Sequence, residues 1–215
     1  MRMRKKPNLP ARMERCAALL TERPEDCPGR WRELYRPGAP LHLELGCGKG
    51  RFTVEQSGAH PEALFVAMDV VPDAMVVAME RALEAGRDNL RFISGDAARL
   101  CDWFAPGEVD VLYINFCDPW PRNRHAKRRL TADGFLALYR VILKEGGCIR
   151  FKTDNRPLFD FSLERLAACG WRVTDVTYDL HADGPADIMT DYEVKFSEQG
   201  IPIHRCIAWK ETKEV

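Results

Sequence analysis

Residues 41–50 read LHLELGCGKG, and this stretch decides the fold of the chain. Its first five residues form an apolar run with the length of a buried strand, and three glycines follow before a segment with helical spacing. Glycine adopts positive φ without strain and lets the backbone approach a ligand closely. The first turn of the next helix offers free N–H groups. The stretch therefore predicts a strand, a ligand-binding turn and a helix, with a tight turn that binds nothing as the alternative.

The same alternation continues along the chain. Short apolar runs at 64–69, 90–93, 109–115 and 148–152 alternate with helical patterns at 73–85, 131–143 and 155–169. Such alternation predicts an α/β fold with a mostly parallel sheet and helices on both faces. Late in the chain, 171–178 and 202–209 are typical of strands, with a helix near 192–198 between them. Because these two strands lack a full crossover, they predict an antiparallel hairpin at one sheet edge.

Length and composition fit one globular domain with an arm. The chain has 215 residues, of which 46% are hydrophobic and 30% charged, so it can form a core and is not disordered. Residues 1–40 are rich in Pro, Arg and Glu and are predicted to form a basic, partly flexible arm with one short helix near 13–20. Residues 41–215 form the predicted domain. The formal net charge is zero, but basic residues gather in the arm and in 122–129, so the charge is segregated.

The eight cysteines indicate a reducing compartment. None of them forms a C-x-x-C pair, and no secretory signal or apolar run of membrane-spanning length accompanies them. We therefore expect a cytoplasmic protein with reduced thiols, no membrane segment and no metal site.

The glycine pattern separates two classes of cofactor. A dinucleotide fold favours G-x-G-x-x-G, but here the third glycine, Gly50, comes one residue early, which disfavours a nicotinamide enzyme. The pattern E-x-G-x-G-x-G, which contains Glu44, Gly46 and Gly48, resembles motif I of S-adenosylmethionine-dependent methyltransferases. The methionine end of that cofactor carries an amino group and a sulfonium cation, so an acid in the strand suits it.

Two more acids follow successive strands. Asp69 ends the second strand, where a carboxylate can accept hydrogen bonds from both ribose hydroxyls. Asp96, followed by Ala97, comes just after the third strand and is placed to accept from the adenine amino group. Each acid alone is equally compatible with a helix N-cap or a turn. Three acids at successive strand ends favour the cofactor interpretation, because open α/β sheets bind ligands at the carboxyl ends of their strands.

The most informative stretch follows the fourth strand. Residues 118–130 read DPWPRNRHAKRRL. An acid, two prolines that stiffen the turn, an aromatic ring and a dense run of cations suit a nucleobase held near a phosphate backbone. Considered alone, the basic run would be a solvated helix start.

This stretch resembles the signature of the bacterial tRNA (guanine-N7)-methyltransferase family, and FKTDN at 151–155 and TDYE at 190–193 support the resemblance. The resemblance covers about residues 41 to 210 and implies a class I methyltransferase fold. It also implies methyl transfer from S-adenosylmethionine to N7 of a guanine in the tRNA variable loop, position 46 in tRNA numbering. Position 122 is Arg where Lys is frequent, which changes hydrogen-bond geometry but keeps the charge. Position 117 is Cys where a small polar residue is common.

The resemblance assigns roles residue by residue. Cofactor binding falls to Glu44, Gly46, Gly48, Asp69, Asp96, Ala97 and Asp118. Substrate binding falls to Arg122, Asp154, Thr190, Asp191, Tyr192 and Glu193. RNA contacts fall to Asn123, Arg124, His125, Ala126, Lys127, Arg128 and Arg129. The partner is tRNA, and the protein is expected to be a monomer or a homodimer.

Asp118 is the expected catalytic residue. Guanine N7 has a free lone pair in the neutral base, so attack on the methyl group needs no prior deprotonation. We therefore favour a role in orienting guanine and balancing charge, although a general base stays open.

Two other functions compete with the tRNA assignment. A small-molecule methyltransferase on the same fold would not need the basic run. An RNA-binding protein without catalysis would be expected to lose some of the cofactor residues, all of which are present.

Overall fold

The computed structural model describes residues 6–183 and 188–211, which form a seven-stranded sheet with the order β3-β2-β1-β4-β5-β7-β6. The strands are β1 (Leu41–Leu45), β2 (Leu64–Asp69), β3 (Leu90–Ser94), β4 (Val109–Asn115), β5 (Leu143–Thr153), β6 (Trp171–Thr177) and β7 (His204–Lys210). Strands β1 to β5 pair in parallel, and β7 is antiparallel to both of its neighbours, β5 and β6. The predicted mostly parallel sheet and the antiparallel edge are confirmed.

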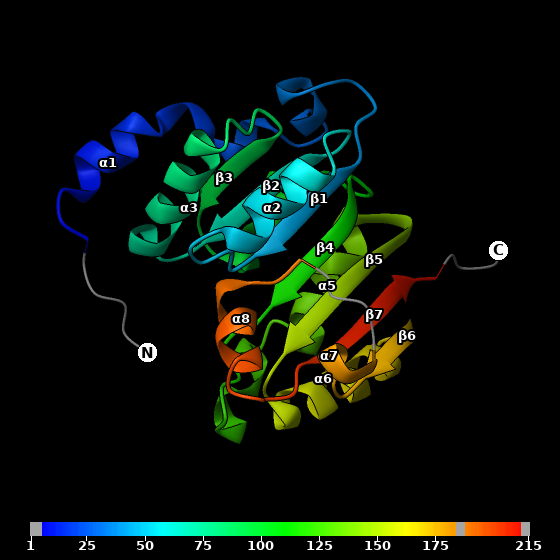
Figure 1. The fold of residues 1–215 in the computed structure, drawn as a ribbon. Helices are drawn as coiled ribbons and strands as arrows, with labels where there is room; N and C mark the ends of the chain where they lie inside the picture. Colours follow the sequence, from blue (N-terminus) through cyan, green and yellow to red (C-terminus); the bar gives the residue numbers. More distant parts are fainter. Residues whose placement is uncertain (1–5, 184–187, 212–215) are drawn as a thin grey trace.

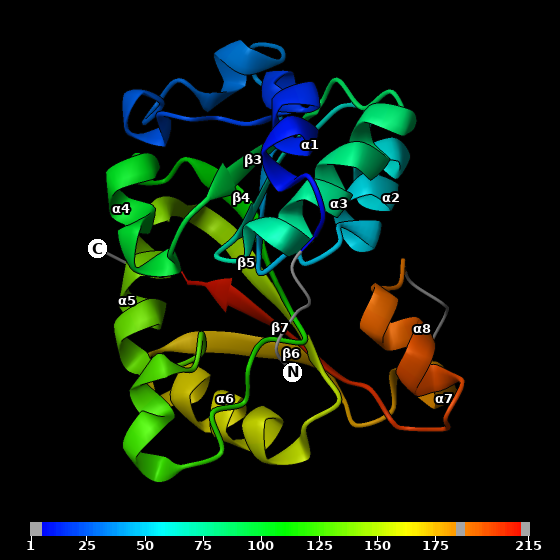
Figure 2. The ribbon, with the colours of Figure 1, turned by 90° about the vertical axis from the view of Figure 1, so that its left-hand side faces the viewer.

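Helices lie on both faces of the sheet (Figures 1 and 2). On one side lie α4 (Leu100–Trp103), α5 (Asp133–Ile142) and α6 (Arg156–Ala168). On the other side lie α1 (Leu9–Arg15), α2 (Arg51–Ala59), α3 (Pro72–Glu84), α7 (Leu180–Asp183) and α8 (Asp191–Ser197). Short 3₁₀ helices are η1 (Ala17–Leu19), η2 (Pro24–Asp26), η3 (Trp31–Leu34), η4 (Ala97–Arg99) and η5 (Asn123–Arg128).

Two hydrophobic cores fill the spaces between these layers. Successive side chains of a strand point to opposite faces, so Leu43 packs into the core shared with α5 and α6, and Phe65 into the core shared with α3. The same alternation turns Glu44 towards the face that carries α2. The period of two that forms the cores thus also selects which acid faces the glycine turn.

Two elements differ from the sequence-based expectation. The strand expected at 148–152 begins at Leu143, directly after α5, because residues 144–147 form an irregularity between the Val109–Leu143 and Val111–Cys148 pairs. Gly146 has φ of 71° there, so the glycine pair bends the strand without ending it. The first helix begins at Leu9 and not near residue 13, because Pro10 is compatible with a first helical turn.

Residues 6–40 lie against the rest of the molecule. Arg12 on α1 donates two hydrogen bonds to Glu80 on α3. Trp31 is fully buried in the larger core, and its Nε1 donates to the Trp103 carbonyl at 2.7 Å. The division of the chain at residue 40 into an arm and a domain stays a prediction, and residues 1–5 of the basic cluster lie outside the described part.

In the described residues, no helix is long and apolar enough to cross a membrane, and no group of three or more His, Cys, Asp or Glu side chains could hold a metal ion. All eight cysteines have free thiols.

Candidate active site

Acids follow the carboxyl ends of the five parallel strands, at one edge of the sheet: Glu44, Asp69, Asp96, Asp118 and Asp154. The charge of Asp118 raises the pKa of Asp69, and the charge of Asp69 raises that of Glu44. The structure therefore brings three of the predicted site acids, from β1, β2 and the segment after β4, within electrostatic reach of one another.

The glycine turn leaves open space above the sheet edge. Gly46, Gly48 and Gly50 have φ of 74°, 57° and 76°, a region that favours glycine. A Cβ on Gly46 or Gly48 would meet nothing within 4 Å, whereas one on Gly50 would lie 2.4 Å from the Ala78 Cβ. The first two glycines thus border free space where a ligand can approach the backbone, and the third allows α2 to start against α3.

Glu44 is buried beneath this turn. Its carboxylate accepts a hydrogen bond from the Thr53 hydroxyl on α2 and another from Asn115 Nδ2 at 3.0 Å. Burial raises the pKa of Glu44 to about 7, although the Asn115 hydrogen bond opposes the shift. The proton affinity of this acid therefore lies within reach of physiological pH.

Asp69 is held by the backbone. Its two carboxylate oxygens accept hydrogen bonds from Gly48 N–H and from Val71 N–H, each at 2.8 Å. Burial raises the pKa of Asp69, and these backbone hydrogen bonds oppose the shift. Asp69 therefore connects the end of β2 to the glycine turn of β1 and fixes their relative position.

Asp96 caps η4. Its Oδ1 accepts a hydrogen bond from Ala98 N–H at 2.9 Å, and Ala97 is buried behind it. Gly95 N–H donates to the Asp69 carbonyl at 3.1 Å, which places this turn beside the end of β2. Capping and adenine recognition are compatible, because one carboxylate can accept several hydrogen bonds.

The segment after β4 is strained and exposes Asp118. Phe116 and Trp120, which flank this acid, have φ of 51° and 41°, and such conformations are costly for aromatic residues. Arg129 stabilises the segment, because its guanidinium donates to the carbonyl oxygens of Pro119 at 3.0 Å and Trp120 at 3.1 Å. Strain of this kind clusters at functional sites.

The basic run divides into two parts. Arg122, Arg124, Lys127 and Arg128 are exposed on or beside η5, and the Arg128 guanidinium lies 5.0 Å from the centre of the Trp120 ring. Arg129 is half-buried, with its guanidinium 4.3 Å from the centre of the Phe161 ring on α6. The exposed cations form a surface that an anion can reach, whereas Arg129 is engaged by the protein.

The TDYE motif forms the start of α8. Thr190 and Glu193 form a capping box, and Glu193 is fully buried with Oε2 3.5 Å from Lys152 Nζ. Asp191 accepts a hydrogen bond from Arg81 at 2.7 Å. Only Tyr192 is exposed, at 56%, and its ring stacks 6.3 Å from that of Phe116. The motif thus lies beside the Asp118 segment, with Tyr192 available for a substrate and its neighbours engaged in holding α8.

Two residues that the sequence did not single out hold this arrangement together. Arg81 on α3 donates to the Lys49 carbonyl at 3.0 Å as well as to Asp191, so it connects the glycine turn to α8. Lys152 is almost fully buried, and its Nζ donates to the Ile188 carbonyl at 3.3 Å. Nothing in the pattern of α3 identifies Arg81, because its partner is 110 positions away. Lys152 lies inside the FKTDN motif, where a lysine in a buried strand is itself a signal.

Asp154, the next residue of that motif, is half-buried before α6, and Asn155 caps this helix by accepting from Leu158 N–H at 2.9 Å.

The residues at this edge fit S-adenosylmethionine. Open space borders Gly46 and Gly48, and the Asp69 carboxylate next to it suits a ribose diol. Beside Glu44, Asn115 Oδ1 is buried and has no hydrogen-bond partner within the described part of the chain. A buried acceptor in this state favours a bound donor, such as the amino group of the cofactor.

Comparisons with known proteins agree with this geometry. A family model described as "Putative methyltransferase" matches residues 38–206. Among solved structures, the 16S rRNA methyltransferase KamB superposes with a TM-score of 0.66 at 17% identity, over 86% of this chain and 94% of that one. A precorrin-6y C5,15-methyltransferase from Geobacter metallireducens superposes with a TM-score of 0.58 at 14% identity, over 96% and 94%. At these identities the neighbours show a shared methyltransferase fold.

Curated relatives match the chain over nearly its whole length. The tRNA (guanine-N(7)-)-methyltransferase of Lachnoclostridium phytofermentans is 43% identical and covers 98% of this chain and 99% of its own. That of Halalkalibacterium halodurans is 44% identical and covers 100% and 98%. The chain therefore belongs to the tRNA (guanine-N(7)-)-methyltransferase family.

Proposed function

We propose that this protein transfers the methyl group of S-adenosylmethionine to N7 of a guanine in the variable loop of tRNA, at position 46 in tRNA numbering, to form 7-methylguanosine. One observation carries the proposal: Asp118 is exposed on a strained segment that joins the cofactor acids to a surface of four exposed cations. The names of the full-length relatives support the same substrate and position of attack on the base.

The chemistry requires positioning more than proton transfer. S-adenosylmethionine supplies an electrophilic methyl group on a sulfonium sulfur. Guanine N7 attacks with its free lone pair, so no residue has to remove a proton first. Holding the two reactants in line and matching the movement of positive charge are therefore the main sources of rate enhancement.

Each part of the site has a task in this reaction. Asp69 binds the ribose and Asp96 the adenine, while Glu44 and Asn115 receive the amino group of the methionine end. Asp118 accepts hydrogen bonds from the donor edge of guanine, N1–H and N2–H₂, and its negative charge stabilises the positive charge that arrives on the purine.

The substrate side recognises RNA. Arg122, Asp154 and the exposed ring of Tyr192 contact the guanosine, since aromatic rings stack on splayed bases. The exposed cations of η5 bind phosphates. A methyltransferase for a small molecule would have no use for this surface, so we place that alternative second.

Eight free thiols favour a reducing environment, so we propose a cytoplasmic site of action. Light scattering will decide between a monomer and a homodimer.

A labelling experiment tests the proposed function. The protein is incubated with methyl-labelled S-adenosylmethionine and a tRNA transcript, and the nucleosides are analysed after digestion. We expect labelled 7-methylguanosine from the normal transcript and none from a transcript with 7-deazaguanosine at the target, because a C–H group then replaces N7. Label in any other nucleoside, or equal labelling of both transcripts, would refute the proposal.

A further inference from the structure

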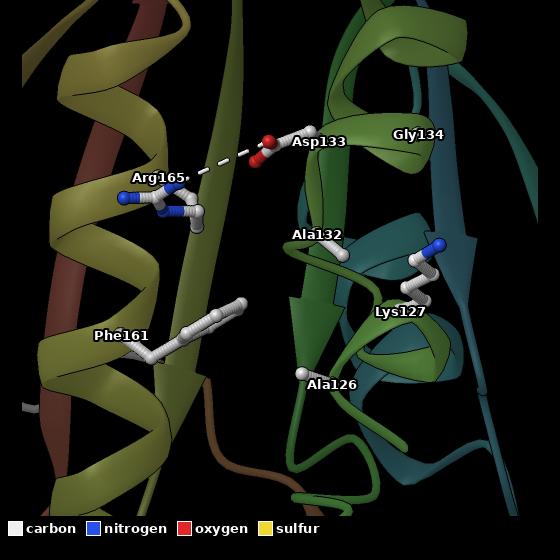
Figure 3. A pocket seen from close by; sticks show the side chains of 7 residues that line it. All are labelled: Ala126, Lys127, Ala132, Asp133, Gly134, Phe161 and Arg165. Carbon is white, nitrogen blue, oxygen red and sulfur yellow. Dashed lines mark ion pairs between the residues drawn. The ribbon is translucent and has the colours of Figure 1, made fainter. Parts of the chain in front are cut away.

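A groove lies between the two helices behind the Asp118 segment. It has a volume of about 450 Å³ and runs between the start of α5, the basic η5 and one face of α6. Figure 3 shows Phe161 and Arg165 extending from α6 towards Asp133 and Ala132 on the facing wall. This volume lies within the range of sites that hold small organic groups, yet none of the cofactor acids lines it.

The groove is connected to the active site through one arginine. The Phe161 ring in its wall carries the Arg129 guanidinium at 4.3 Å. The same guanidinium donates to the carbonyl oxygens of Pro119 and Trp120. A group that stacks in the groove would therefore lie one residue away from the segment that presents Asp118.

The charge of the groove suits an anion with an aromatic part. Lys127 lies both in the groove and in the exposed cationic surface, and it has no acidic partner within ion-pair distance among residues 6–183 and 188–211. Arg165 Nη1 is 3.9 Å from Asp133 Oδ2, a distance typical of a weak exposed pair that a ligand can replace. Aromatic and small apolar side chains, Phe161, Ala126 and Ala132, form the rest of the wall.

We propose that this groove holds an unpaired nucleotide of the tRNA other than the target guanosine, with its base against Phe161 and its phosphate beside Lys127 and Arg165; this rests on the function proposed above. The argument for a nucleotide is the continuity of the groove with the cationic surface. A phosphate contact and a stacking surface then belong to one chain of RNA. Binding there would anchor the loop while the guanosine enters the active site.

Gly134 provides a test that does not disturb the fold. It lies in the first turn of α5 and lines the groove, and a Cβ at this position would meet nothing within 4 Å. Its φ is not positive, so Gly134→Met fills the groove while favouring the helix. Gly134→Ala is the matched control, because it makes the same backbone change with almost no added volume.

Binding is measured first, without cofactor, as the dissociation constant of a tRNA transcript at fixed salt. We expect Gly134→Met to raise this constant about tenfold, the effect of losing one stacked base, and Gly134→Ala to change it less than about twofold. The affinity for S-adenosylmethionine and the single-turnover rate at saturating tRNA should stay at wild-type values. If Gly134→Met binds the transcript as the wild type does, the inference is overturned.

Transcripts that each lack one base in the variable loop or its flanks identify the occupant. One abasic transcript should weaken binding to the wild type about tenfold and have no further effect on Gly134→Met, since both changes remove the same contact. Additive effects at every position would overturn the inference even if Gly134→Met binds weakly.

The outcome also separates this inference from the proposed function. A wild-type enzyme that forms 7-methylguanosine, with a groove variant that binds tRNA normally, refutes the groove alone. A wild-type protein that shows the groove-dependent binding but makes no 7-methylguanosine refutes the proposed function alone.

Discussion

The two halves of the active site are held in different ways. In the cofactor half, the glycine turn and the end of β2 are joined by backbone N–H groups that donate to Asp69. In the substrate half, the segment after β4 is held in a strained conformation by the Arg129 side chain, and α8 is connected to α3 by the pair between Arg81 and Asp191.

This difference indicates which half can change. Backbone hydrogen bonds between adjacent parallel strands are preserved whenever the sheet forms, whereas contacts made by side chains depend on single residues. The site for a fixed cofactor is therefore part of the fold itself, and the site for the RNA is an addition to it. Variants should separate the two halves, with effects on cofactor affinity from one and on RNA affinity or rate from the other.

The largest effect is expected at Asp118, where the two halves meet. Asp118→Asn keeps an acceptor oxygen and loses the charge, so we expect the single-turnover rate at saturating tRNA to fall about 10²–10³-fold. Asp118→Ala should lose more, because the donor edge of guanine then has no partner. Equal and complete loss in both variants, with folding and both affinities preserved, would show that the carboxylate is indispensable and would favour a general base.

Asp69 tests the independence of the cofactor half. Asp69→Ala removes the ribose hydrogen bonds, so the affinity for S-adenosylmethionine should fall by about 1–3 kcal/mol, or about five- to 150-fold. Calorimetry measures this affinity, and tRNA binding serves as the internal control and should change little. Asp69→Asn, which keeps one acceptor for the Gly48 N–H, should lie between the wild type and the alanine variant. An unchanged cofactor affinity would remove Asp69 from the binding site.

These expectations show how far the sequence alone can lead. The acids Glu44, Asp69 and Asp96 could be found because strands alternate with period two and end at the same edge of a parallel sheet. Arg129 could not be distinguished from its neighbours, since a run of cations does not reveal which side chain turns inwards to bind carbonyl groups. Arg81 and its partner Asp191 lie in separate helices, so only their packing in space brings them together.

The cationic surface of the substrate half tests the role of exposed charge. Neutralising Arg124, Lys127 and Arg128 while keeping the Arg129 clamp should reduce the salt dependence of tRNA binding, because fewer counterions are released. Three lost phosphate contacts predict that the variant loses about 40-fold less affinity than the wild type between 50 and 200 mM salt. Neutralising Arg23, Arg30 and Arg172, which are also exposed, is the control. If the first variant keeps the wild-type slope, the basic run is a solvated surface.

The smallest effect concerns Glu44 and pH, and it tests whether the buried acid of the cofactor half responds to the ligand. Burial raises the pKa of Glu44 to about 7, so without ligand the group is mostly protonated at pH 6 and mostly ionised at pH 8. The amino group and the sulfonium of S-adenosylmethionine are cations, and a nearby cation favours the ionised carboxylate and lowers its pKa. Cofactor affinity should therefore fall as the pH falls through 7, by about tenfold between pH 8 and pH 6 if binding lowers the pKa below 5. Glu44→Gln cannot ionise, so its affinity should be weaker at pH 8 and nearly independent of pH, as calorimetry at several pH values would show. The same pH dependence in Glu44→Gln would assign the titration to another group, with Asp69 the next candidate because burial raises its pKa as well.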